Sequence, residues 1–143
     1  MSHRIRAVLA GCGGISAAWL TPAKEMADLE IVGLVDLREE AARQRAEQFQ
    51  LKDAVIGTDL RSVLKKLKPD VVFDCTLPEA HHSVTLTALK QRCHVLGEKP
   101  LADTMIHARA MVAAAQRAGR IYAVIQNRRY EPNIRRVRRF LAS

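Results

Sequence analysis

Apolar runs of strand length alternate with helix-like segments along this 143-residue chain. Such alternation is typical of βαβ units. We therefore expect an α/β fold with a doubly wound, mostly parallel sheet and helices on both of its faces. The expected strands cover residues 5–10, 31–36, 54–56, 71–75, 94–97 and 121–125. The expected helices cover residues 15–27, 39–50, 60–67 and 79–91. Two further helices are expected, one capped by Asp103 and ended by Gly119, and a last one that starts near Pro132.

Charge, length and cysteine usage exclude several classes of protein. The net charge is +8, but the last 18 residues contribute six arginines and one acid, so only the tail is strongly basic. A basic tail without a motif that recognises nucleic-acid bases does not predict nucleic-acid binding. No apolar run approaches the ~20 residues of a membrane span. Three cysteines without a C-x-x-C pair indicate reduced thiols, as expected for a cytoplasmic protein.

A glycine-rich segment follows the first expected strand. It matches G-x-G-x-x-G at two glycines, Gly11 and Gly13, with Ser16 in place of the third. Gly11 allows a tight turn, and Gly13 lets the backbone approach a pyrophosphate, whose charge the N-terminus of the next helix attracts. Strand, loop and helix together predict a dinucleotide site in a Rossmann-type fold, against a merely structural turn. The loop candidates are Gly11, Cys12, Gly13, Gly14 and Ile15.

Asp36, Leu37 and Arg38 follow the second expected strand. The Asp36 carboxylate can accept both hydroxyls of an adenosine ribose and would repel the 2′-phosphate of NADP. Arg38 could instead pair with that phosphate. We favour NAD over NADP, with a helix-capping Asp36 and a solvated Arg38 as the structural alternative.

Two more clusters follow the fourth and fifth expected strands. After the fourth strand, we expect Thr76 to donate a hydrogen bond to a phosphate or ribose oxygen. We expect Pro78 to fix the turn beside Leu77. His81 is expected either to lie beside a nicotinamide or to cap the following helix. Because no two histidines have H-x-x-x-H spacing on one helix, no metal site is predicted.

Glu98-Lys99-Pro100 follows the fifth expected strand. Adjacent Glu and Lys usually form a surface ion pair. At the ligand-binding edge of a parallel sheet, however, a lysine beside a cationic ring gives up its proton more readily and can exchange it with a substrate hydroxyl. Lys99 is therefore the candidate catalytic residue, and the sequence leaves open whether Pro100 is cis.

These motifs, taken in order, resemble the N-terminal domain of the glucose–fructose oxidoreductase / inositol dehydrogenase / MocA-like family. The resemblance covers essentially the whole chain. The most specific parts are E-K-P after the fifth strand and N-R-R after the sixth. The matching segments are G-C-G-G-I-S at 11–16, V-D-L-R at 35–38, T-L-P-E-A-H at 76–81, E-K-P-L-A at 98–102 and Q-N-R-R-Y-E-P at 126–132.

The resemblance implies an NAD- or NADP-dependent oxidoreductase that moves a hydride between the nicotinamide and a sugar, polyol or related carbonyl substrate. It implies that Thr76, Pro78 and His81 line the cofactor crevice and that Glu98 lies by the nicotinamide ribose. It assigns Lys99 to substrate binding and catalysis, and it places Asn127 and Arg128 near a domain junction.

Members of that family continue for roughly twice this length, into a second domain that forms the substrate wall and the usual oligomer interface. We therefore expect a cofactor domain at 1–126, and at 127–143 a linker and amphipathic helix leading to that domain. Alone, such a chain would bind cofactor with little or no turnover, because hydride transfer needs a positioned substrate. The competing hypotheses are a non-catalytic dinucleotide-sensing module, a methyltransferase and, least favoured, a nucleic-acid binder.

Overall fold

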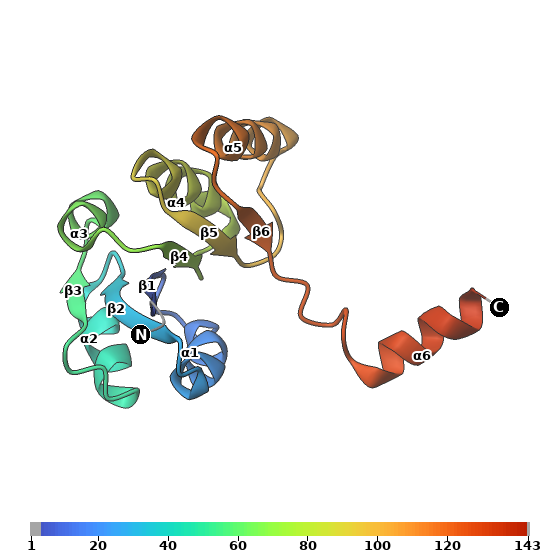
Figure 1. The fold of residues 1–143 in the computed structure, drawn as a ribbon, viewed down its shortest axis with the longest axis horizontal. Coiled ribbons are helices and arrows are strands. Elements are labelled where there is room, and N and C mark those ends of the chain that lie inside the picture. The colour runs from blue at the N-terminus through green and yellow to red at the C-terminus, as the bar shows by residue number, and fades with distance from the viewer. Residues whose placement is uncertain (1–3, 143) are drawn as a thin grey trace.

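The computed structural model describes residues 4–142. Six strands and six helices alternate through this part of the chain (Figure 1). The strands are β1 (Ile5–Ala10), β2 (Leu29–Val35), β3 (Val55–Gly57), β4 (Val71–Asp74), β5 (His94–Gly97) and β6 (Tyr122–Val124). The helices are α1 (Ser16–Glu25), α2 (Glu39–Gln48), α3 (Leu60–Leu67), α4 (Pro78–Lys90), α5 (Met105–Ala118) and α6 (Pro132–Leu141).

All six strands form one parallel sheet in the order β3-β2-β1-β4-β5-β6. The chain winds outward from β1 to β3, then returns to the other side of β1 and winds outward to β6. The strand order thus reverses between β1 and β4, which is where ligands bind in folds of this kind. The predicted Rossmann-type, doubly wound architecture is confirmed.

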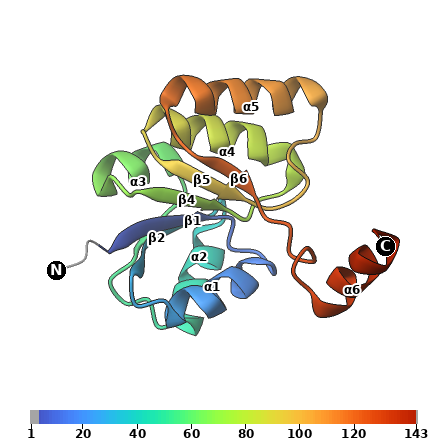
Figure 2. The same ribbon diagram turned by 45° about the vertical axis from the view of Figure 1, so that its right-hand side comes forward.

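Helices cover the two faces of the sheet unequally. Helices α1 and α2 pack on one face, and α3, α4 and α5 on the other (Figure 2). Side chains of β1 alternate between the two resulting cores, with Ala7 and Leu9 on the first side and Val8 and Ala10 on the second. A strand buried on both faces is apolar throughout, which explains the continuous apolar runs in the sequence.

Capping residues explain several element boundaries. Asp59 begins α3 by accepting the backbone N–H of Ser62 at 2.7 Å. Gly119 ends α5 in the left-handed conformation, with φ +60°. The N-cap of α5 is Thr104, whose side chain accepts the N–H of His107, so the prediction of Asp103 as the cap is wrong by one residue. Asp103 bonds the His107 ring instead.

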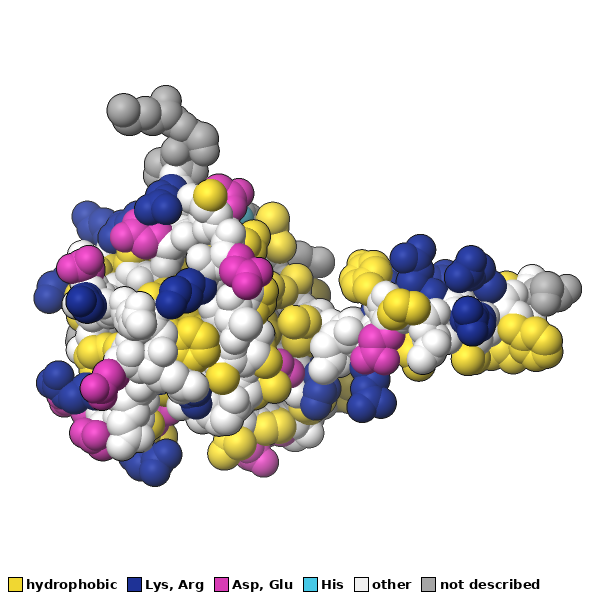
Figure 3. All heavy atoms as spheres, turned by 90° about the horizontal axis from the view of Figure 1, so that it is seen from below, with side chains coloured by type: hydrophobic (Ala, Val, Ile, Leu, Met, Phe, Trp, Pro, Cys, Tyr) yellow, Lys and Arg dark blue, Asp and Glu magenta, His cyan; other side chains and the backbone are white. Residues whose placement is uncertain are grey.

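The last helix stands apart from the layered body in both ribbon views (Figures 1 and 2). None of its described residues is buried. Its arginines and apolar side chains both lie at the surface (Figure 3). Within residues 4–142, no helix is both long and apolar enough to cross a membrane.

Candidate functional site

The carboxyl ends of the central strands bring the glycine loop and three other sequence clusters to one edge of the sheet. Ala10, the last residue of β1, lies opposite both Val35 of β2 and Asp74 of β4. Asp74 in turn lies opposite Gly97 of β5. The residues that follow these four strand ends therefore lie around a common edge, as the parallel arrangement predicts.

Gly11 makes the turn at the end of β1. Its φ of +89° is in the region that glycine adopts readily, and a Cβ there would lie 2.6 Å from the carbonyl oxygen of Cys75. The backbone of the loop thus passes directly against the end of β4. A side chain at residue 11 is excluded both by conformation and by space.

Gly13 and Gly14 lie in open surroundings instead. A Cβ at either position would meet nothing within 4 Å. The following helix α1 has Ile15 at its N-cap and no side chain capping its free N–H groups. Ser16 is fully buried and donates its hydroxyl to the Gly13 carbonyl at 2.6 Å, so it fills the place of the third glycine and braces the loop. This bare, open helix start fits a pyrophosphate.

The Asp36 carboxylate is held beside the loop by two backbone donors. Its Oδ2 accepts the N–H of Cys12 at 2.8 Å, and its Oδ1 accepts the N–H of Arg38 at 2.9 Å. Each oxygen retains a lone pair for a ligand hydroxyl. The N-cap of α2 is Arg38 and no side chain caps this helix, so the structural alternative of a helix-capping Asp36 is wrong. Leu37 beside it is 93% exposed.

Arg45 of α2 is a loop contact that sequence reasoning missed. Its Nη2 donates to the Gly13 carbonyl at 2.9 Å and lies 3.4 Å from the carbonyl oxygen of Cys12. These bonds draw the loop carbonyls towards α2. No pattern in the sequence marks this arginine among the other charged residues of α2.

Asp74, buried at the end of β4, organises the next cluster. Its Oδ1 accepts the N–H of Thr76 at 3.1 Å and the Thr76 hydroxyl at 2.5 Å. With its single hydroxyl hydrogen on Asp74, Thr76 leaves its oxygen lone pairs as acceptors. The expected donation from Thr76 to a phosphate or ribose oxygen would have to replace this bond to Asp74, and it stays a prediction. Asp74 is not among the residues predicted from the sequence. The signal that could have found it is an acidic residue at the end of the apolar run Val71–Asp74, because buried acids are rare unless they are paired.

His81 turns inward to Asp74. Its Nδ1 lies 3.0 Å from Asp74 Oδ2, and its side chain is 2% exposed. It does not cap α4, whose N-cap is Leu77, so the capping interpretation is wrong. A position of its ring beside a bound nicotinamide stays a prediction. The hydrogen bond to Asp74 raises the pKa of His81, burial opposes that shift, and the charge of Asp74 adds to it.

The turn between β4 and α4 places its other two candidates at the surface. Leu77 is 73% exposed. Pro78 occupies the first position of α4, where a missing N–H costs nothing. No side chain caps this helix either, so α1 and α4 both present uncapped N-termini to the same edge.

Glu98 joins α1 to the turn after β5. Its Oε1 accepts the indole N–H of Trp19 at 2.8 Å, and its Oε2 accepts the N–H of Lys99 at 3.2 Å. Glu98 is 8% exposed, and Trp19 also packs on Phe73 with 5.4 Å between ring centroids. Adjacent Glu98 and Lys99 do not form the surface ion pair of the alternative interpretation.

Lys99 and Asn127 lie exposed at the same end of the sheet. The Lys99–Pro100 peptide bond is cis. Asn127 lines a cavity of about 620 Å³ together with Val124, Gln126 and Tyr130. The hydrogen bond between Lys99 and Glu98 uses the backbone N–H of Lys99 and leaves its side chain available.

The three cysteines are free and buried. Burial and the nearby Asp36 charge raise the pKa of Cys12 to about 12, so the thiol in the loop stays protonated at neutral pH. Within residues 4–142, no three His, Cys, Asp or Glu side chains are grouped so as to hold a metal ion.

Comparison with known protein families agrees with this geometry. The family model GFO_IDH_MocA, described as an oxidoreductase family with an NAD-binding Rossmann fold, matches residues 5–126. The chain belongs to this oxidoreductase family. The matched region contains the glycine loop and every cluster described above except Asn127.

Two relatives illustrate the range of the family. The D-glucoside 3-dehydrogenase of Escherichia coli K12 is 35% identical over 111 residues, covering 78% of this chain and 31% of the relative. The D-apiose dehydrogenase of Paraburkholderia graminis is 33% identical over 138 residues, covering 96% of this chain and 36% of the relative. The chain thus spans about a third of the length of these dehydrogenases.

Solved structures show the same fold. The WlbA dehydrogenase of Bordetella pertussis, in complex with NADH and UDP-GlcNAcA, superposes with a TM-score of 0.88 at 23% identity, over 99% of this chain and 40% of that one. The 3-ketoreductase KijD10 of Actinomadura kijaniata, in complex with NADP, gives 0.86 at 23% identity, over 98% and 44%.

Proposed function

We propose that this chain is the cofactor-binding part of an NAD-dependent oxidoreductase acting on a sugar, polyol or related carbonyl compound. The observation that carries the proposal is the open backbone cradle at Gly13 and Gly14, followed by an uncapped helix and flanked by the anchored Asp36 carboxylate. Phosphates need such a cradle, and a ribose needs such an acceptor. The sugar substrate class rests on the dehydrogenases to which the chain is similar.

The choice of NAD over NADP rests on Asp36. The two N–H groups that anchor its carboxylate also keep it beside the loop, where the adenosine ribose of a dinucleotide would lie. A fixed negative charge there repels a 2′-phosphate. Arg38 is the residue that would reverse this preference, because its guanidinium is exposed and can pair with that phosphate.

Lys99 is the proposed proton-transfer residue. The nicotinamide, when bound, supplies or accepts the hydride. The Lys99 ammonium would donate a proton to the substrate oxygen during carbonyl reduction and take it back during alcohol oxidation. Glu98 positions this lysine by holding its backbone N–H. The exposed side chain of Lys99 leaves room for the substrate wall that a second domain would provide.

The proposed division is a cofactor domain at 1–126 and, at 127–143, a linker and amphipathic helix leading to a substrate and oligomerisation domain. The boundary agrees with the end of the family match at residue 126. Residues 1–3 and 143 of these two segments lie outside the described residues. The non-catalytic sensing module is not favoured, because the relatives reported above are dehydrogenases.

Titration of the chain with NADH and NADPH tests the proposal. Energy transfer from Trp19, the only tryptophan, to the reduced nicotinamide reports binding, and calorimetry confirms it. We expect saturable binding that is tighter for NADH. Tighter binding of NADPH would move the ribose-recognition role from Asp36 to Arg38, and no binding of either would contradict the dinucleotide site.

Matched variants separate these outcomes. Asp36→Ala should weaken NADH binding and improve the relative affinity for NADPH, whereas Arg38→Ala should leave NADH binding unchanged. Lys99→Ala should bind NADH with the affinity of the parent chain, because a proton-transfer group contributes to turnover rather than to cofactor affinity. A large loss of NADH affinity in Lys99→Ala would instead make Lys99 a cofactor ligand.

A further inference from the structure

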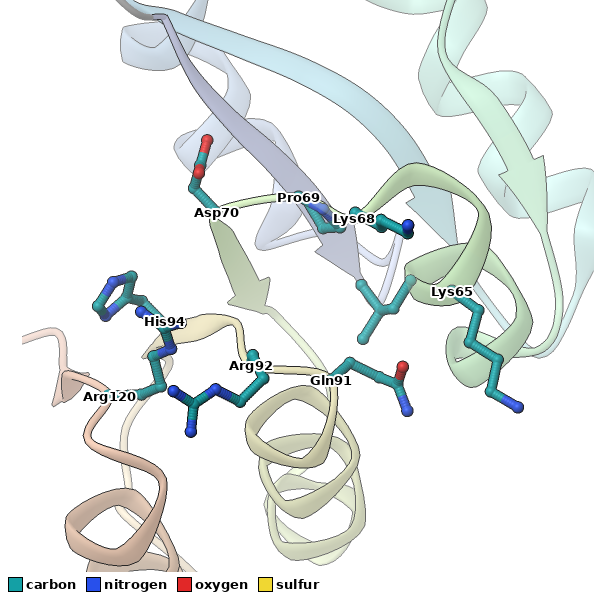
Figure 4. A pocket seen from close by; sticks show the side chains of 9 residues that line it. Lys65, Lys68, Pro69, Asp70, Gln91, Arg92, His94 and Arg120 are labelled. Carbon is teal, nitrogen blue, oxygen red and sulfur yellow. The ribbon is translucent and has the colours of Figure 1, made fainter.

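A second cavity lies at the opposite edge of the sheet, where the strands begin. It has a volume of about 460 Å³, within the range of small-molecule sites, and it is formed where α3, α4 and α5 end (Figure 4). Nothing in the proposed cofactor site uses these residues. Strand β4 separates the two regions, since it runs from this cavity to Asp74.

Four cationic side chains line the cavity: Lys65, Lys68, Arg92 and Arg120. The lysines lie on one side of it, and the arginines, with His94, on the other (Figure 4). None of the four pairs with a carboxylate among residues 4–142, where the ion pairs lie elsewhere. The cavity is therefore ringed by positive side chains that form no ion pair within the described part of the protein.

The one acid lining the cavity is already engaged. Asp70 Oδ2 accepts the backbone N–H of Arg6 at 2.8 Å, and in the close view its carboxylate points away from the cations (Figure 4). His94 accepts the N–H of Ile121 through Nδ1, so its ring proton is on Nε2, which is a donor. Donors thus outnumber acceptors around the cavity.

Arg120 supplies an unmet donor. Its Nε is buried and has no hydrogen-bond partner in the described residues. Arg92 uses Nη1 on the carbonyl of Ala118, at 3.0 Å, and keeps its remaining N–H groups. A buried guanidinium N–H without an acceptor is unfavourable, and a bound oxyanion would satisfy it.

The backbone holds two of these cations in an unfavourable conformation. Lys68 has φ +47° and Arg92 has φ +64°, in the left-handed region where glycine is the ordinary choice. Lys68 directly follows the last residue of α3, and Arg92 lies two residues after the last residue of α4. A glycine would be tolerated at either position without strain. Strained backbone of this kind often marks a functional position.

The negative C-terminal ends of the three helices attract the four cationic side chains of the cavity, but this attraction alone does not explain why all four lie together. Each helix C-terminus carries about half a negative charge, so three such ends and Asp70 offset about 2.5 of the four positive charges. A positive excess of more than one elementary charge is left for a ligand.

We propose that this cavity is a binding site for a multiply charged oxyanion, such as the phosphate groups of a small molecule. The guanidinium groups of Arg92 and Arg120 would bind the oxyanion directly, and Lys68 would hold it from the opposite side. This site is independent of the dinucleotide site at the other edge.

Titration with inorganic pyrophosphate tests the site. The Gly13→Val chain is used, in a phosphate-free buffer with 150 mM salt, so that the glycine loop does not take up the probe. We expect one saturable site by calorimetry, with amide shifts in the NMR spectrum confined to residues around Lys68, Arg92 and Arg120. Binding only at very low salt would mean that pyrophosphate merely samples a positive surface, and the proposal would be wrong.

Variants locate the binding. Arg120→Gln should weaken pyrophosphate at least tenfold, whereas Arg117→Gln, an equal charge change on the last turn of α5 and outside the cavity lining, should weaken it less than twofold. Lys68→Gly should stabilise the fold by relieving its backbone while it weakens binding. Equal effects of Arg120→Gln and Arg117→Gln on pyrophosphate affinity would overturn the site.

Discussion

The two glycines of the loop are required for different reasons, and substitution separates them. Gly11→Ala places a Cβ against the backbone of Cys75 and forces a side chain into a positive φ. We expect it to lower the free energy of unfolding by about 2–4 kcal/mol, from left-handed strain plus overpacking. Urea denaturation followed by circular dichroism measures this loss.

Gly13→Val should instead leave stability within about 0.5 kcal/mol, because its Cβ meets nothing within 4 Å. The same substitution should weaken NADH binding at least tenfold, since the new side chain would occupy the path of the pyrophosphate. Unchanged NADH affinity in a folded Gly13→Val chain would contradict the loop assignment.

His81 should make stability depend on pH. Its pKa is raised in the folded state, so the imidazolium form favours folding. The stabilisation is complete below the unfolded pKa of about 6.5 and is lost as pH rises through the higher folded value. His81→Asn keeps a donor near Asp74 but does not titrate. The difference in unfolding free energy between parent and His81→Asn should therefore shrink between pH 5.5 and 8.5. A constant difference would mean that His81 is not charged in the folded protein.

At the scale of elements, the Trp19–Glu98 bond fastens α1 to the turn that carries Lys99. Trp19→Phe keeps an aromatic ring beside Phe73 but leaves the buried Glu98 oxygen without its donor. We expect a loss of about 1–3 kcal/mol in unfolding free energy. The double variant with Glu98→Gln should lose less than the sum of the single losses, because both remove one bond. Additive losses would show that the two side chains act separately.

Most elements were predictable because their patterns are local. Strand β1 and helix α3 were predicted with the bounds that the structure shows, since an apolar run and a capped amphipathic segment define them. The clusters at the strand ends were also predictable, because a parallel sheet aligns its carboxyl ends. The roles of individual side chains were not. Arg45 reaches the loop from another helix, and Asp74 accepts a hydrogen bond from the Thr76 hydroxyl. Both contacts depend on packing rather than on spacing in the sequence.

At the scale of the whole molecule, the layered body and α6 should behave as separate units. The sheet, its five covering helices and the turns that join them contain all the buried apolar side chains of the described chain, and α6 contributes none. Its apolar arc remains at the surface, with Ile134 44%, Val137 55% and Leu141 78% exposed. Body stability therefore should not depend on this helix.

A chain shortened to residues 1–130 tests this independence while keeping Asn127. We expect its melting temperature to lie within about 2 °C of the parent, since the shortened chain loses no buried contact worth 1 kcal/mol. NADH affinity should stay within twofold, and binding of an apolar dye should fall because the exposed arc is gone. A melting temperature lowered by more than about 5 °C would show that α6 packs against the body in solution. Undiminished dye binding would place the exposed apolar surface on the body, where α5 carries Met105 at 68% and Ile106 at 80% exposure.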